Sequence, residues 1–363
     1  MDPDHGRFPP PAPHRRADAF HPSPDAGAVR TPPYAPADPA VPNRRSRGPR
    51  PIAPGAEYHR VLAGEKRHIG RGILAIALLL AGMFVFSFAI VQAAAFIDAR
   101  MGYTNPASGG TDYTPVYHGL SMFSLALLIP WSMCIQWWLY GVKGPSLHSV
   151  VSRFRFDVFG RALLIIGPVW LIATVAMHIG APVEQTYWPI ADLIAILVTT
   201  LLLTPLQAAG EEYGLRGLVF RVAGSWSRGP RAGLVLGVLV SSLVFTAIHG
   251  AGDPWINIWY FTLAVSLAAI TWRTGGIETA VVIHALLNTV TFVFVTAMHS
   301  DIGASISDRS AGVGSPVLLV PTVTVAAIAA VVWLRTRRTG PALTPAHPSP
   351  HPHAQSASVP TAQ

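Results

Sequence analysis

Eight long apolar segments divide this 363-residue chain into alternating apolar and polar stretches. Each contains about 18 to 25 residues, the length that an α-helix needs to cross the ~30 Å hydrocarbon core of a bilayer. Only 12% of all residues are charged, which is too few for the surface of a water-soluble globule of this size. The sequence therefore predicts an all-α fold, a polytopic membrane bundle of about eight transmembrane helices, at residues 72–96, 119–141, 160–180, 189–210, 232–249, 255–272, 277–298 and 317–334.

The two ends of the chain differ in composition from its apolar middle. Residues 1–68 are rich in proline and arginine, and residues 339–363 are rich in proline, serine, alanine and histidine. Segments with so few large apolar side chains bury too little surface to offset the entropy cost of folding. We therefore expect a disordered N-terminal tail, a transmembrane domain over residues 69–338 and a disordered C-terminal tail.

The net charge of +8 at pH 7 follows a topological pattern. Both tails and every second connection between apolar segments are basic, whereas the other connections are neutral to acidic. Cytoplasmic connections of membrane proteins carry an excess of Lys and Arg, so an even number of spans places both termini in the cytoplasm. The sequence predicts a multi-pass protein of the cell membrane, surrounded by the lipid bilayer, and argues against a partner that is a nucleic acid.

Six ionisable or amide side chains lie within or beside the apolar segments. A charged group that faces lipid is costly, so such residues mark either a polar cluster that holds the helices together or a functional site. Burying an ion pair seldom adds net stability, which favours the functional interpretation for so many groups. The six candidate site residues are Glu211, Glu212, Arg216, His249, His284 and Asn288.

Helical spacing indicates which of these groups can meet. Residues four apart lie on one side of a helix, so Glu212 can pair with Arg216, and His284 lies beside Asn288. Glu211 is turned by about 100° from its neighbour, so the two carboxylates can take different roles. One of them can stay ionised beside the arginine while the other acts as a base.

These groups must also lie at similar depths in the membrane. Glu211 is nineteen residues before Pro230 and His249 is nineteen residues after it, so a helical hairpin that turns there brings the two side chains level. This requires the helix that carries Glu211 to continue to near Trp226. His284 follows the preceding turn by about eight residues, which places it ~12 Å below the cytoplasmic surface. We expect three helices to bring their polar groups together near the inner leaflet.

Three short motifs carry a family resemblance. They read EEYGLR at residues 211–216, FTAIH at residues 245–249 and HALLN at residues 284–288. In order and spacing they resemble the EExxxR, FxxxH and HxxxN signatures of the CPBP (Abi) family, membrane peptidases related to the type II CAAX prenyl endopeptidase. The resemblance covers about residues 190–298. It implies an endopeptidase that hydrolyses a peptide bond of a membrane-anchored peptide or protein near the cytoplasmic face.

The resemblance also implies a role for each residue of the motifs. Glu211 would activate the attacking water, supported by the ion pair of Glu212 and Arg216. Peptide hydrolysis needs such a base, and it also needs donors where negative charge develops. His249 would position or deprotonate the water, and Phe245 would pack the site. The developing oxyanion would face His284 and Asn288.

The sequence leaves open whether the site contains a metal ion. Glu211, His249 and His284 are candidate zinc ligands, because one carboxylate and two imidazoles leave a fourth position for water. The HExxH motif of zinc peptidases does not occur in the sequence. A glutamate-dependent mechanism without a tightly held metal explains the same residues, and it is the interpretation that we prefer.

Two other interpretations fit part of the sequence. Residues 250–253 spell the GxGD string of intramembrane aspartyl proteases, with Asp192 as a candidate partner for Asp253. Gly and Asp before Pro254 are also ordinary turn residues, which is the interpretation that we favour. The chain could instead be a non-catalytic membrane protein, an immunity or scaffold factor or a proton-coupled transporter, that uses the Glu and His cluster structurally.

Overall fold

The computed structural model describes residues 49–179 and 185–346 of the chain, and these residues fold into helices. Within this part of the chain, eight helical segments are long and apolar enough to cross a membrane. The predicted all-α fold and its eight spans are thus confirmed. The helices are α1 (Ile69–Arg100), α2 (Pro115–Ala126), α3 (Leu128–Tyr140), α4 (Phe156–Ile179), α5 (Ile190–Glu212), α6 (Phe220–Gly224), α7 (Pro230–Ile248), α8 (Pro254–Thr274), α9 (Glu278–Ala297), α10 (Ile302–Ser307) and α11 (Leu319–Thr336).

The second span consists of two helices, α2 and α3, because of a proline. Pro130 has no N–H to donate to the carbonyl of Ala126, and its ring crowds that carbonyl. Helix α2 ends at Ala126, and α3 begins two residues later at Leu128. Together the two helices form one apolar span of 26 residues.

The fourth span continues well past the paired carboxylates. Helix α5 ends at Glu212 and runs directly into a π-helix at Tyr213–Val219, which leads into α6. This continuous segment of 35 residues confirms the extension that the depth argument required. Pro230 occupies the first turn of α7, where its missing N–H has no helical partner to lose.

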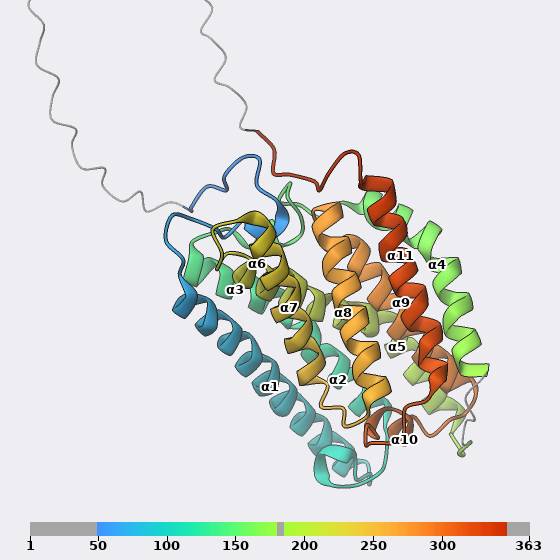
Figure 1. The fold of residues 1–363 in the computed structure, drawn as a ribbon. Helices are drawn as coiled ribbons and strands as arrows, with labels where there is room; N and C mark the ends of the chain where they lie inside the picture. Colours follow the sequence, from blue (N-terminus) through green and yellow to red (C-terminus); the bar gives the residue numbers. More distant parts are fainter. Residues whose placement is uncertain (1–48, 180–184, 347–363) are drawn as a thin grey trace, which may run out of the picture. The chain divides into compact units, whose positions relative to one another are not determined.

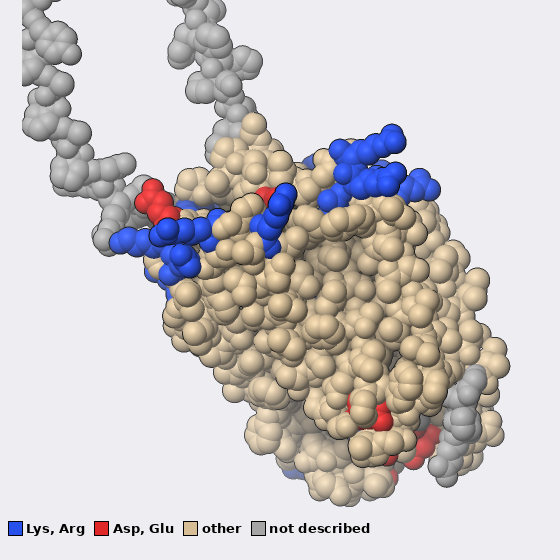
Figure 2. Space-filling view, viewed as in Figure 1, with Lys and Arg blue, Asp and Glu red and all other residues tan. Residues whose placement is uncertain are grey.

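Helix α5 packs against α2 and α9, and its last turn, at 207–212, is buried. Helix α8 packs against α7 on one side and α11 on the other (Figure 1). Lys and Arg side chains gather at the end of the bundle that contains α6 and the last turn of α11 (Figure 2). We call it the arginine-rich end and define it by Arg228, Arg273 and Arg335. This asymmetry is the one that the charge pattern predicted, and its orientation toward the cytoplasm stays a prediction.

The structure shortens both predicted tails. Residues 49–68 and 339–346 were expected to be disordered, but they pack on the arginine-rich end. Tyr58 is fully buried and its hydroxyl donates a hydrogen bond to the carbonyl of Leu147. The N–H of Thr344 donates to the carbonyl of Ala56 at 2.9 Å, which joins the two segments. The average composition of these segments is proline-rich, but a few of their apolar side chains bury enough surface for the segments to fold. The rest of both tails lies outside the described residues.

Helices α5 and α2 approach each other closely at Gly210. A Cβ atom there would lie 2.1 Å from the carbonyl oxygen of Leu125, which belongs to the backbone. We therefore expect Gly210→Ala to lower the free energy of unfolding by about 1–3 kcal/mol, as overpacked sites do. Denaturant unfolding in detergent micelles measures this change. The matched control is Gly160→Ala in α4, where a Cβ meets nothing within 4 Å, and equal stability of the two variants would contradict the close approach.

Candidate active site

The three motifs contribute buried side chains from three spans. Glu211 and Glu212 end α5 where the π-helix begins, and Arg216 lies inside the π-helix. Single π-helical turns widen a helix and are frequent at functional sites. His249 follows the last residue of α7, and His284 lies in the second turn of α9. Exposure is 8% for Glu211, 0% for Glu212 and Arg216, and 3% for His284.

Glu212 links two of the motifs. Its Oε1 lies 3.0 Å from Nη1 of Arg216 and accepts a hydrogen bond of 2.7 Å from Nδ1 of His284. Within the described residues, the guanidinium nitrogens of Arg216 form no hydrogen bond. The contact with Glu212 is therefore an ion pair without hydrogen-bond geometry. The guanidinium carbon also lies 4.4 Å from the ring centre of Phe245, which is a cation–π contact. This cluster fixes the ring of His284 with Nε2 on the side away from Glu212.

Glu211 is linked to Asn288 through a residue that the motifs do not contain. Gln207 donates a hydrogen bond of 2.5 Å from Nε2 to Oε1 of Glu211, and its own Oε1 accepts one of 3.0 Å from Nδ2 of Asn288. Nε2 of His284 lies 3.8 Å from Oε2 of Glu211. The sequence held a signal for Gln207, because it is a polar residue four positions before Glu211 in an apolar span.

His249 lies at the edge of the same cluster, in contact with two aromatic rings. Its ring centre is 4.4 Å from that of Phe245 and 4.1 Å from that of Tyr260. Phe245 in turn contacts His284, with ring centres 5.9 Å apart. The structure thus gathers the candidate residues of all three motifs around Phe245, and Asn288 joins them through Gln207.

The aspartate of the GxGD string has a structural task. Asp253 accepts hydrogen bonds at Oδ1 from the N–H groups of Trp255 and Ile256, which caps the start of α8. Its Oδ2 accepts another from the N–H of Gly312. Burial alone would raise the pKa of Asp253, but these backbone donors outweigh it and lower that pKa. A carboxylate that is bound in this way supports the turn interpretation.

The three candidate zinc ligands do not form a metal site. Within the described residues, no group of three or more His, Cys, Asp or Glu side chains has an arrangement that could hold a metal ion. Nδ1 of His284 is engaged with Glu212, and Nδ1 of His249 with the carbonyl of Phe245. Such contacts also hold the histidines of zinc sites, so they fit a mechanism with or without a metal. The steps below are derived from the protein's own groups.

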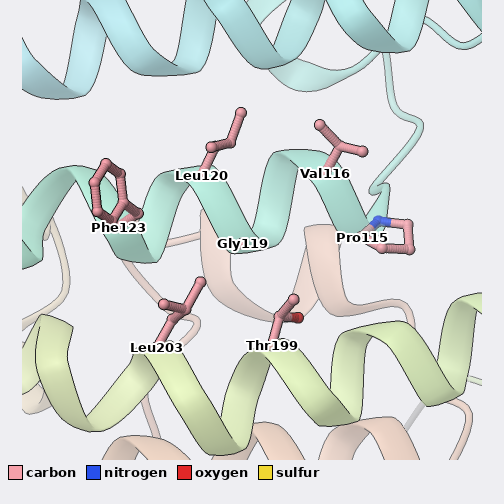
Figure 3. A pocket seen from close by; sticks show the side chains of 7 residues that line it. All are labelled: Pro115, Val116, Gly119, Leu120, Phe123, Thr199 and Leu203. Atoms are coloured by element: carbon pink, nitrogen blue, oxygen red, sulfur yellow. The ribbon is translucent and has the colours of Figure 1, made fainter.

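An apolar hollow of about 560 Å³ lies between α2 and α5, away from the polar cluster. Figure 3 shows that its lining residues come from both helices. None of the six candidate residues lines this hollow, so it is not the candidate site. Its lining residues are Pro115, Val116, Gly119, Leu120, Phe123, Thr199 and Leu203.

Comparisons with known proteins point to the same region of the chain. Residues 191–290 match the family described as type II CAAX prenyl endopeptidase Rce1-like. The uncharacterised protein YyaK of Bacillus subtilis (strain 168) is 31% identical over 116 residues, which are 30% of this chain and 38% of that protein. A component of the ion-translocating oxidoreductase complex of Aeromonas salmonicida (strain A449) is 25% identical over 183 residues, which are 46% of this chain and 49% of that component.

The matched part of this chain covers less than half the length of each of these two relatives. No solved structure matches the chain significantly. The family match contains all six candidate residues, and the helices that it spans are those that meet around Phe245. Residues 191–290 are therefore an Rce1-like type II CAAX prenyl endopeptidase domain of the CPBP (Abi) family.

Proposed function

We propose that this protein is an intramembrane endopeptidase that hydrolyses a peptide bond with water activated by Glu211. The observation that carries the proposal is the meeting of two carboxylates with one imidazole in a buried site. Glu212 binds Nδ1 of His284 at 2.7 Å, and Glu211 lies 3.8 Å from Nε2 of the same ring. A purely structural cluster needs only the first contact. Within the described residues, Oε2 of Glu211 is 3.8 Å from Nε2 of His284 and accepts no hydrogen bond, so it is free to act as a base.

The reaction follows from the remaining donors and acceptors. Oε2 of Glu211 takes a proton from water while the water oxygen bonds to the carbonyl carbon of the peptide. His249 donates from Nδ1 to the carbonyl of Phe245, so its Nε2 can accept the second water hydrogen and orient the molecule. The C–N bond then breaks as the proton on Glu211 passes to the leaving nitrogen, which gives a carboxylic acid and an amine. The acid then transfers its proton to the amine, so the products are a carboxylate and an ammonium group.

Negative charge develops on the carbonyl oxygen during this attack. Asn288 uses one amide N–H on Gln207 and keeps a second one for the oxyanion. His284, when protonated, donates from Nε2 on the same side. A buried site strengthens such hydrogen bonds, because the surroundings screen charge less than water does. Glu212 and Arg216 hold His284 in place throughout.

Substrates of the family are proteins, and His284 lies in the second turn of α9, which follows Arg273 of the arginine-rich end after a short turn. The positive-inside pattern places this end in the cytoplasm, so we propose that the scissile bond belongs to a membrane-anchored chain near the inner leaflet. A peptide with a prenylated cysteine near its C-terminus is one such substrate. A membrane-anchored peptide without a prenyl group is another.

The test is cleavage by the purified protein in liposomes made with H₂¹⁸O. The probes are a peptide that ends in a farnesylated cysteine and three further residues, and a transmembrane peptide without farnesyl. Mass spectrometry should find one ¹⁸O atom in the new carboxylate, and the Glu211→Gln protein should release no fragment. If the folded wild-type protein cleaves neither probe nor a library of membrane-anchored peptides, the non-catalytic alternative gains support.

A further inference from the structure

Two residues outside the three motifs hold His249. The ring of Tyr260, on α8, lies against the imidazole with centres 4.1 Å apart and an angle of 37° between the planes. Arg309, in the connection between α10 and α11, donates a hydrogen bond of 2.7 Å from Nη1 to the carbonyl oxygen of His249. The guanidinium carbon of Arg309 also lies 5.9 Å from the ring centre of Tyr260. The imidazole therefore contacts two aromatic rings, and the backbone of His249 binds a cation from a distant segment.

The connection that carries Arg309 is itself fastened to the turn after His249. The N–H of Gly252 donates a hydrogen bond of 2.8 Å to the carbonyl of Arg309. Asp253 accepts a hydrogen bond of 2.9 Å from the N–H of Gly312. These contacts join the connection to the α7–α8 turn at two points and keep the backbone of Arg309 beside His249.

His249 needs this support because it follows the last residue of its helix. The last carbonyl groups of a helix have no partner within it, so the carbonyl of His249 can accept the hydrogen bond from Arg309. One ring nitrogen is engaged, since Nδ1 contacts the carbonyl of Phe245 at 2.7 Å. With Nδ1 as donor, Nε2 is the acceptor of the ring, and the contacts with Phe245 and Tyr260 restrict the direction in which it points.

We propose that Tyr260 and Arg309 are positioning residues that hold the His249 imidazole with Nε2 toward the attacking water. The proposal rests on the proposed peptidase function for its catalytic consequence, but the holding itself is a property of the structure. Neither residue touches the reacting atoms. Tyr260 acts through the face of its ring, whereas Arg309 acts through the backbone of His249.

The first experiment measures the holding without any substrate. The full-length protein in detergent is treated with diethyl pyrocarbonate, and mass spectrometry gives the labelling rate of each histidine. Tyr260→Leu and Arg309→Ala should each raise the rate at His249 several-fold, because the imidazole becomes accessible. His284, which Glu212 holds, should keep its rate and serves as the internal control. Tyr260→Phe, which retains the ring, should restore slow labelling of His249.

The second experiment measures the consequence for cleavage of the farnesylated peptide. Tyr260→Leu should lower kcat by about 10- to 100-fold with little change in KM, as displaced catalytic groups do, and Tyr260→Phe should restore it. Unchanged labelling of His249 in both disruptive variants would overturn the proposal whatever the activity. Faster labelling with unchanged kcat would overturn the catalytic part. If the wild-type protein cleaves nothing, the proposed function fails, while the labelling still decides whether these residues hold His249.

Discussion

Glu211→Gln is expected to lower kcat for peptide hydrolysis by about 10²- to 10⁴-fold, the usual contribution of a general base, and to leave the protein folded. Glutamine has the same shape but takes up no proton at neutral pH. Its carbonyl oxygen can still accept the hydrogen bond that Gln207 donates to Glu211. The replacement also removes a buried charge, whose desolvation opposes folding. Steady-state cleavage and thermal unfolding in the same detergent measure both effects.

Glu278→Gln is the matched control for this prediction. Glu278 is a fully buried carboxylate on α9, like Glu211 in chemistry but outside the polar cluster. Arg155 binds it from Nη2 at 2.8 Å, so its replacement should reduce stability and leave kcat within a few-fold. A similar loss of kcat in both variants would mean that removal of any buried carboxylate impairs the protein. Glu211 would then lose its role as the base.

The sequence was sufficient to predict the spans and most of the polar cluster, for physical reasons. The length of an apolar segment determines whether it can cross a bilayer. The spacing of four residues in a helix determines that Glu212 lies beside Arg216. The equal distances of Glu211 and His249 from Pro230 required a long fourth helix, and the structure contains it. Each of these inferences depends on contacts within one helix or on one turn.

The parts that were missed depend on contacts between distant segments. Arg309 is 60 residues from His249, and nothing local in the sequence indicates that its connection folds back. Tyr260 looked like an ordinary residue of an apolar span. The π-helix after Glu212 arises from hydrogen bonds that helix propensity does not distinguish from those of an α-helix. Tyr58 was hidden in a proline-rich tail whose average composition indicates disorder.

Arg216→Ala is expected to lower the free energy of unfolding by about 3–5 kcal/mol, the range for breaking one side of a buried ion pair. Glu212 would remain fully buried with its charge balanced by no guanidinium. The cation–π contact with Phe245 would be lost as well. Denaturant titration in mixed micelles, followed by tryptophan fluorescence, measures the change.

Two comparisons separate this effect from general damage. Arg161→Ala breaks an ion pair of the same spacing with Asp157, but both side chains are about two-thirds exposed, so the loss should be below about 1 kcal/mol. The double variant Glu212→Gln with Arg216→Met removes both charges and should recover most of the stability that Arg216→Ala loses. Such recovery, with cleavage still impaired, would indicate that the pair is kept for the position of His284 and not for folding. If Arg216→Ala were as stable as Arg161→Ala, the guanidinium would not be what balances the buried carboxylate.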